Sequence, residues 1–271
     1  MRTLALFIAY DGSAFHGWQS QPAPLRTVQD ELTKILRRVL KHPLHVTGAS
    51  RTDTGVHALR QVASVQTASP IPAENLRRAL GDRLPADISL VHACEARADF
   101  DPIQHAMEKL YRYRVWNSHA KPIESGPARP AWRFWYDLDL DRMRAAAADL
   151  CGTHDFAGFA SAGSPRASTV RTIRRAAVDR RFEEVTLDFI GDGFLYQQVR
   201  NMVGTLVEIG RGLWPVERVR EVLASRDRTL ASGPAPSCGL TLQWIRYPRG
   251  SFAATPDRAI PPGASISGDA E

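Results

Sequence analysis

The sequence predicts an α/β protein made of two halves of similar size. Two observations favour this class: strand and helix patterns alternate within residues 1–105, and a second set of strands and helices follows over 106–248. No sequence repeat of fixed period relates the two halves. Residues 249–271 are mainly Pro, Gly, Ala and Ser, so we expect them to form a disordered tail.

In the first half, strand and helix patterns follow one another closely. The first apolar run ends at the turn signal Asp11-Gly12. Thr27 is a candidate helix N-cap, because Asp30 stands three residues later and apolar residues then recur at helical spacing. The predicted elements are strands over 4–10, 61–67 and 88–93 and helices over 28–40 and 72–83.

The second half contains a strand with two chemically different faces. Residues 109–117 place Arg112 and Arg114 on one face and Tyr111 and Tyr113 on the other. Two interpretations stay open: a nucleic-acid surface, or an amphipathic edge strand whose arginines extend into solvent. The remaining predicted elements are strands over 184–190 and 240–245 and helices over 141–150, within 191–212 and over 216–224.

Arginines are concentrated between positions 166 and 181. Six arginines stand there against one acidic residue, Asp179. A solvated strand face usually mixes both signs of charge, so this stretch favours phosphate binding. The candidates for contacts with a phosphate backbone are Arg171, Arg174 and Arg175. The segment 161–168 is small and polar, and we expect it to be mobile.

Composition and charge restrict the possible partners. The chain has 271 residues, a formal net charge of +6 and a sequence pI near 9.5, values that fit an anionic partner. The three cysteines form no C-x-x-C pair, which predicts a reducing compartment and neither a zinc site nor a disulfide framework. No apolar run approaches the roughly 18 residues that a membrane-spanning helix needs.

A polar decapeptide, G-A-S-R-T-D-T-G-V-H over 48–57, carries the strongest candidate for chemistry. Arg51 and Asp53 stand two residues apart, and Gly48 and Gly55 permit backbone angles that other residues resist. A half-buried carboxylate is costly unless it is paired, so a nearby arginine suits an aspartate that acts as a nucleophile or base. The alternative is a turn with a surface ion pair.

Seven motifs, in one order, give the chain a resemblance to a known family. They are Y-D-G-S-A-F-H-G-W-Q-S-Q from Tyr10, T-V-Q-D-E-L from Thr27, R-T-D-T-G-V-H-A from Arg51, Y-R-Y from Tyr111, H-D-F-A-G-F from His154, G-F-L-Y-Q-Q-V-R-N-M-V-G from Gly193 and G-L-T-L from Gly239. In this the chain resembles the TruA-type tRNA pseudouridine synthases over nearly its whole length except the tail.

The resemblance implies an α/β fold of two pseudo-related halves, each a mixed, largely antiparallel sheet flanked by helices, with a basic cleft between them. It implies a cytoplasmic homodimer that binds tRNA and isomerises uridine to pseudouridine at positions 38–40 of the anticodon stem-loop. It also implies that the reaction uses no cofactor and no metal.

The resemblance also assigns roles to individual residues. Asp53 matches the catalytic aspartate, as nucleophile or base, and Arg51 matches an arginine that pairs with it and eases the uridine out of its stack. Tyr111 matches a tyrosine that packs against the flipped base. Arg200 matches a second arginine that pairs with the carboxylate; on the residues alone, the alternative for the polar Arg200 and Asn201 in a helix is ordinary surface exposure. The base pocket is expected to be walled by one of two leucines, Leu240 or Leu242.

Two positions depart from the family pattern. Ser50 stands where the family usually has glycine before R-T-D, which puts the backbone of the loop in question. Ile103 stands where the family usually has arginine, which puts one phosphate contact in question.

Two other classes of protein stay open on the residues alone. A non-catalytic RNA-binding protein would use the same basic surfaces without needing Asp53. An aspartic protease would use D-T-G at Asp53–Gly55, but only one such triplet occurs and its surroundings are polar.

Overall fold

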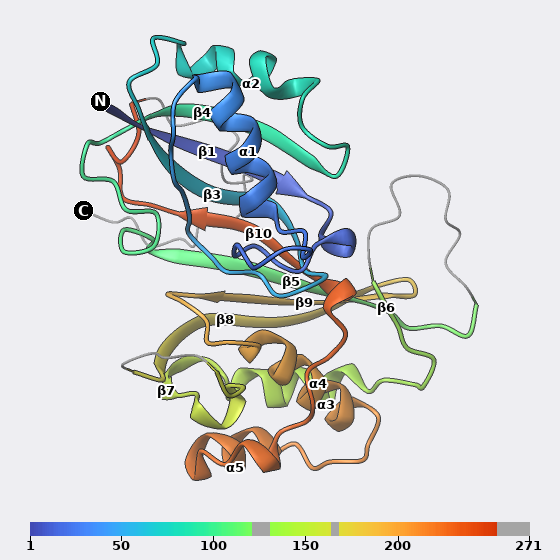
Figure 1. Ribbon diagram of the computed structural model, residues 1–271. Coiled ribbons are helices and arrows are strands. Elements are labelled where there is room, and N and C mark those ends of the chain that lie inside the picture. The colour runs from blue at the N-terminus through green and yellow to red at the C-terminus, as the bar shows by residue number, and fades with distance from the viewer. Residues whose placement is uncertain (121–130, 164–167, 254–271) are drawn as a thin grey trace. The chain divides into compact units, whose positions relative to one another are not determined.

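The computed structural model describes residues 1–120, 131–163 and 168–253 (Figure 1). These residues form two compact units, and the α/β class is confirmed. The first unit comprises 1–52, 58–107 and the chain from Trp244 onward, and the second comprises 53–57 and 108–243. The chain therefore passes between the units more than once. The division into domains 1–105 and 106–248 stays a prediction, as does the basic cleft.

The first unit is built on a small antiparallel sheet. β1 (Arg2–Tyr10) lies between β3 (His57–Thr67) and β4 (Ile88–Ala96), and β2 (Val46–Gly48) pairs with β3. Two helices, α1 (Val28–Leu40) and α2 (Ala73–Gly81), cover one face of these strands (Figure 1). The predicted cap of α1 is confirmed, because the Thr27 hydroxyl accepts a hydrogen bond from the backbone N–H of Asp30.

The strands of the second unit follow the order β5-β9-β8-β7, with antiparallel pairing throughout that order. These strands are β5 (Glu108–Trp116), β9 (Glu184–Gly191), β8 (Val170–Arg181) and β7 (Gly152–Asp155). The two-residue β6 (Trp132–Arg133) runs parallel to β5. β10 (Leu240–Arg246) lies beside β5, and its residues from Trp244 belong to the first unit.

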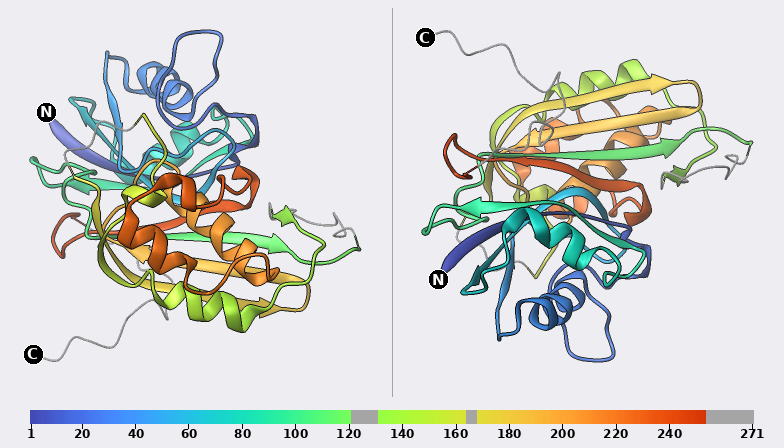
Figure 2. Two further views of the ribbon diagram at one scale, coloured as in Figure 1. Left: turned by 90° about the horizontal axis from the view of Figure 1, so that it is seen from below. Right: turned by 90° about the horizontal axis from the view of Figure 1, so that it is seen from above.

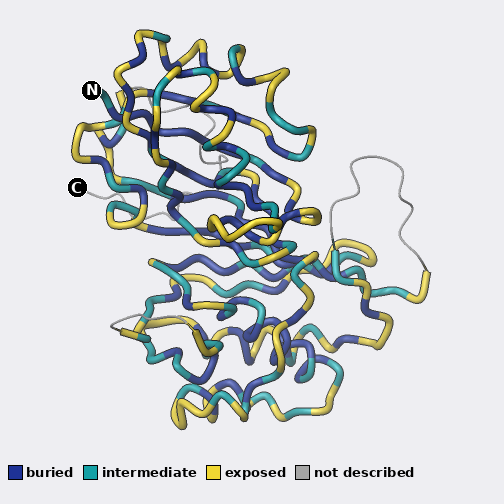
Figure 3. The backbone as a smooth tube through the Cα atoms, in the orientation of Figure 1, coloured by how far each residue is buried: buried dark blue, intermediate teal, exposed yellow. Residues whose placement is uncertain are grey.

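Three helices, α3 (Leu140–Ala148), α4 (Gln198–Gly210) and α5 (Arg218–Ser225), pack together on one face of the strands of the second unit (Figure 2). Nearly every residue of α4 is buried, so this helix is enclosed by protein on all sides. Figure 3 shows the same distribution along the backbone, with burial concentrated in the strands and in α4 and exposure in the connecting loops. The described part of the chain has no helix long and apolar enough to cross a membrane.

Two expectations need correction. Strand β5 is not an edge strand, since it pairs with β9 and lies beside β10. The chain is also ordered beyond Arg249: Ser251 is buried, and the Phe252 ring packs against Phe7 and Phe100. The physical reason is the apolar side chain of Phe252, which packs against the first unit although the segment around it is rich in small and polar residues. Residues 254–271 lie outside the described residues.

Candidate active site in the Asp53 loop

The first part of the decapeptide is fixed by side chains of the first unit. The fully buried side chain of Gln61, on β3, bonds both backbone groups of Ser50: Oε1 accepts from Ser50 N at 3.2 Å and Nε2 donates to Ser50 O at 2.6 Å. The Tyr10 and Thr52 hydroxyls lie 2.7 Å apart. Gly48 is required by packing, because a Cβ there would lie 2.2 Å from the Trp18 ring. The approach to Asp53 is therefore rigid.

Asp53 itself packs with the second unit and is paired with Arg200. Arg200 Nη1 donates to Asp53 Oδ2 at 3.1 Å, and the side chains of Arg200 and Asp53 are only 13% and 16% exposed, respectively. A turn follows at once: Val56 N donates to Asp53 O at 3.1 Å, and Gly55 has a φ of +78°. The surface ion-pair interpretation of this loop is therefore wrong, since the pair is largely buried.

Burial and pairing act on Asp53 in opposite directions. Burial raises the pKa of the Asp53 carboxyl, and the hydrogen bond and charge of Arg200 lower it; the effect of burial is larger, so the pKa lies above that of an ordinary aspartate. A carboxylate that is partly desolvated accepts a proton or attacks carbon more readily than one in water. Arg200 keeps that carboxylate in a single orientation.

Arg200 and Asn201 lie in the first turn of α4, and neither is an ordinary surface residue. Asn201 is fully buried, and its Nδ2 donates to Phe159 O at 2.7 Å. Arg228 Nη2 donates to Asn201 Oδ1 at 2.8 Å. Surface exposure is therefore the wrong explanation for these two polar residues.

The other predicted pocket residues lie on two strands and in the loop itself. Tyr111, on β5, is 6% exposed, and its ring meets Phe194 edge to face with centroids 5.3 Å apart. Leu240 and Leu242 are both buried in β10. Arg51 is exposed and belongs to the first unit, and its pairing with Asp53 stays a prediction.

The arginines of β8 differ in their surroundings. Arg174 Nη1 pairs with the buried Glu108 Oε1 at 2.8 Å, and Arg171 donates to the backbone carbonyls of Ser168 and Val170. Arg175 is exposed. Arg166 and part of the segment 161–168 lie outside the described residues. Phosphate binding by this strand stays a prediction.

The arginines of β5 face acids on the neighbouring strand. Arg112 makes two hydrogen bonds to Asp188, at 2.6 and 2.7 Å, and Arg114 pairs with Glu184. Asp188 and Glu184 both lie on β9. The charge on this face of β5 is therefore largely balanced, which counts against the strand as a nucleic-acid surface.

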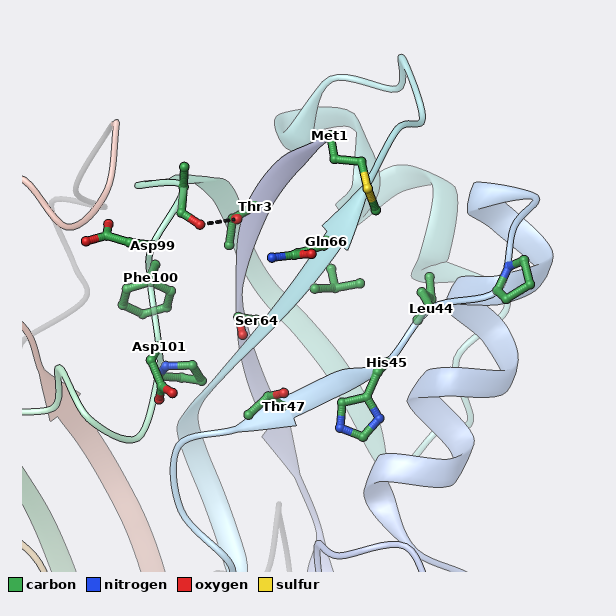
Figure 4. A pocket seen from close by; sticks show the side chains of 14 residues that line it. Met1, Thr3, Leu44, His45, Thr47, Ser64, Gln66, Asp99, Phe100 and Asp101 are labelled. Atoms are coloured by element: carbon green, nitrogen blue, oxygen red, sulfur yellow. Dashed lines mark hydrogen bonds between the residues drawn. The ribbon is translucent and has the colours of Figure 1, made fainter.

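A pocket of about 500 Å³ lies elsewhere, in the first unit (Figure 4). It is lined by β1, β2, β3 and the 98–102 segment, where the Thr3 hydroxyl donates to Ala98 O at 3.2 Å. No residue of the 48–57 loop lines it. The described residues contain no group of three or more His, Cys, Asp or Glu that could hold a metal ion.

Several residues that shape the site carried no recognisable signal. Gln61 and Ala235 act through contacts with Ser50 and Arg200, and neither belongs to one of the seven motifs. Tyr113 is the last residue of the Y-R-Y motif and one of the two tyrosines on a strand face, but the sequence assigned it no role of its own. Its hydrogen bond to Pro236, 123 residues away in the chain, is visible only in the structure.

Fold and loop together define the class: an α/β protein in which a turn presents one largely buried, arginine-paired carboxylate. A family model described as tRNA pseudouridine synthase matches residues 6–102 and 146–248. The chain therefore belongs to the tRNA pseudouridine synthase family, a family of isomerases.

Three relatives, each called tRNA pseudouridine synthase A, span most of the chain. The proteins from Thermoanaerobacter sp. (strain X514) and Moorella thermoacetica are 39% and 42% identical, and each alignment covers 91% of this chain and 100% of the relative. The protein from Limosilactobacillus fermentum is 42% identical over 91% of this chain and 96% of its own length. Membership in this enzyme family counts against the aspartic protease and the non-catalytic RNA-binding protein.

Among solved structures, the archaeal box H/ACA sRNP Nop10-Cbf5 complex aligns with 75% of this chain and 44% of that chain. The identity is 11% and the TM-score 0.34, values too low for this likeness to support a conclusion about function.

Proposed function

We propose that this chain isomerises uridine to pseudouridine at positions 38–40 of the anticodon stem-loop of tRNA, with Asp53 as the catalytic residue. The observation that supports the proposal is the ion pair of Asp53 with Arg200 in a turn that excludes most solvent. The names of its relatives support tRNA as the substrate. The anticodon position follows from the resemblance of the motifs.

The reaction needs a closed pocket. The C1′–N1 bond of uridine breaks and a C1′–C5 bond forms, so the detached uracil must rotate without escaping. The uridine must first leave the stem-loop stack, at a cost of a few kcal/mol that contacts with the protein offset. We assign Tyr111 to the face of the flipped base and Leu240 to the apolar wall. An apolar wall also excludes the water that would hydrolyse the sugar.

Asp53 has two chemical routes open to it. As a nucleophile, its carboxylate attacks C1′ and displaces uracil, which returns through C5. As a base, it abstracts the C2′ proton of the ribose while the C1′–N1 bond breaks, which releases uracil and leaves a glycal-like intermediate to which uracil then adds through C5. Both routes need the ionised carboxylate, and Arg200 favours that form.

The remaining assignments concern tRNA binding and assembly. We assign Arg51 to the extrusion of the uridine, and Arg171, Arg174 and Arg175 to phosphate contacts. We also propose a homodimer, a cytoplasmic location and a reaction without a cofactor. The positive net charge of +6 supports a polyanionic partner.

The test is release of tritium from C5-labelled uridine in tRNA, because forming the C1′–C5 bond expels the C5 hydrogen. The wild-type chain is expected to release tritium, and Asp53→Asn to release none while it binds tRNA with an affinity within about threefold of wild type. The amide nearly matches the carboxylate in size, so folding is preserved. Turnover by Asp53→Asn would overturn the role of Asp53.

A further inference from the structure

Residues 232–235, which follow α5 in the chain, lie directly against α4. Ser232 N donates to Thr205 Oγ1 at 3.1 Å, and Ala235 N donates to Arg200 O at 3.1 Å. A Cβ on Gly204 would lie 2.5 Å from Gly233 O, so helix and segment are in backbone contact. The segment therefore follows the helix back to the turn that carries Arg200.

Ala235 holds Arg200 at two points. Besides the backbone bond, Arg200 Nε donates to Ala235 O at 2.7 Å. A planar guanidinium fixed at Nε has a fixed direction for its Nη atoms. Arg200 Nη1 then meets Asp53 Oδ2 at 3.1 Å. The place of the Ala235 carbonyl thus determines where the cation meets the carboxylate.

The next two residues are fixed from two other sides. The Tyr113 hydroxyl, on β5, donates to Pro236 O at 2.6 Å, and the Tyr113 side chain is fully buried. A Cβ on Gly239 would lie 2.6 Å from the Tyr113 ring, so the segment lies against that ring. A Cβ on Gly55 would lie 2.5 Å from Ser237 Oγ, which places Ser237 against the turn that follows Asp53.

We infer that Tyr113 is a positioning residue for the proposed reaction: its hydroxyl fixes residues 235–237, and through them holds Arg200 against Asp53. The inference rests on the proposed function of Asp53. Three consecutive residues, Ala235, Pro236 and Ser237, contact Arg200, Tyr113 and the Asp53 turn in that order. The Tyr113 hydrogen bond therefore ties the middle residue of the three to the sheet.

Tyr113 does not itself titrate in the range where Asp53 does. Burial raises the pKa of Tyr113 well above that of an ordinary tyrosine, so its hydroxyl stays a donor. Burial also raises the pKa of the nearby Cys238 thiol. Among the described residues of the second unit, Arg200 is the charged group that acts on Asp53. In a plot of the rate against pH, the acid limb is the low-pH side, where activity is lost as the pH falls. A shift of this acid limb therefore reports on the pKa of Asp53 and on its pairing with Arg200.

The test is Tyr113→Phe, which removes one hydroxyl and keeps the ring against Gly239. Initial rates of tritium release are measured across pH at saturating and at low tRNA. We expect kcat to fall about tenfold, the worth of one hydrogen bond, with KM changed less than about twofold. We also expect the acid limb to move up by roughly half a pH unit, because a loosened Arg200 lowers the pKa of Asp53 less.

The chain contains a matched control. The Tyr247 hydroxyl donates to Pro102 O at 2.7 Å in the first unit, so Tyr247→Phe deletes the same kind of bond, from a tyrosine hydroxyl to a proline carbonyl. Both variants are expected to lower the melting temperature to a similar degree. Tyr247→Phe is expected to keep the wild-type kcat and acid limb. Equal rate profiles for the two variants would overturn the inference.

Two further variants test whether Tyr113 acts through Arg200. In Tyr113→Phe combined with Arg200→Lys, the loss in kcat is expected to be no greater than in Arg200→Lys alone; fully multiplicative losses would contradict the inference. Replacement of Tyr113 by 4-aminophenylalanine keeps a donor at the same place and is expected to restore the acid limb. A persistent shift would overturn the role of the donor, and this variant also serves if Tyr113→Phe does not fold.

Failure of the Tyr113 inference can be distinguished from failure of the proposed function. If the wild-type chain releases no tritium, the proposed function fails and the positioning role of Tyr113 in that reaction fails with it. If the wild-type chain is active and Asp53→Asn is not, a Tyr113→Phe profile equal to that of wild type overturns the positioning role alone.

Discussion

Helix α4 and strand β8 both present arginines in the second unit, and their surroundings differ. Arg200 on α4 is 13% exposed and is fixed by a carbonyl on one side and a carboxylate on the other. On β8, Arg174 is 50% exposed and Arg175 is exposed. A buried, doubly bonded cation orients one group, whereas exposed cations attract a polyanion without fixing it. The comparison separates residues that act on the rate from those that act on affinity.

Arg200→Ala should have the largest effect on the α4 side of this comparison. Removing one partner of a buried ion pair costs roughly 3–5 kcal/mol, and partial exposure reduces this. We expect kcat to fall by about a hundredfold with tRNA affinity within about threefold of wild type. Initial rates at saturating tRNA and a filter-binding titration measure the two quantities. A loss confined to affinity would remove the distinction between α4 and β8.

The pH dependence of the wild-type reaction tests the contribution of Arg200 to this comparison. Burial raises the pKa of Asp53, so activity should be lost, as the pH falls, at a higher pH than an ordinary aspartate with a pKa of about 3.9 would give. Arg200 lowers that pKa, so Arg200→Ala should move the acid limb to still higher pH. Rates of tritium release from low pH to neutrality provide the measurement. A downward shift in Arg200→Ala would contradict the sign of the Arg200 contribution.

Arg175→Ala should have a smaller effect, on affinity alone. We expect tRNA binding to weaken a few-fold, with the slope of log affinity against log salt reduced by about 1, and kcat unchanged. Arg175 is the cleaner choice on β8, because Arg174→Ala also removes an ion-pair partner of the buried Glu108. An unchanged salt slope would count against a phosphate contact at Arg175.

Ser50→Gly should have the smallest effect. Ser50 has no positive φ, and its backbone is held by the side chain of Gln61. Glycine is therefore not required at this position, and we expect activity within about twofold of wild type. Gln61→Ala is the contrasting variant, since it leaves both backbone groups of Ser50 without their side-chain partner. Equal activity of the two variants would show that Gln61 does not hold the loop.

Much of the fold could be predicted because it follows local rules. The Thr27 cap and the apolar spacing after it predicted α1 correctly, and alternation predicted the two faces of β5. The short strands β2, β6 and β7 were missed, because two to four residues carry little periodicity and pair only where a longer neighbour is present.

The site was predictable only in part, and for a physical reason. Asp53 and Arg200 belong to motifs, and the structure brings these two side chains together. The contacts that hold the site join a side chain to a backbone group: Gln61 to Ser50, and Arg200 to the Ala235 carbonyl. Any residue type provides the backbone partner, so that partner leaves no mark in the sequence. Ser50 drew attention as a departure from the family pattern, yet the contact that matters there comes from Gln61.

The most direct test of the central claim is a pseudouridine map of unmodified tRNA after incubation with the purified chain. The proposal predicts new pseudouridine at positions 38–40 with the wild-type chain and none with Asp53→Asn. Pseudouridine formed at those positions by Asp53→Asn, or formed by the wild-type chain only outside the anticodon stem-loop, would contradict it.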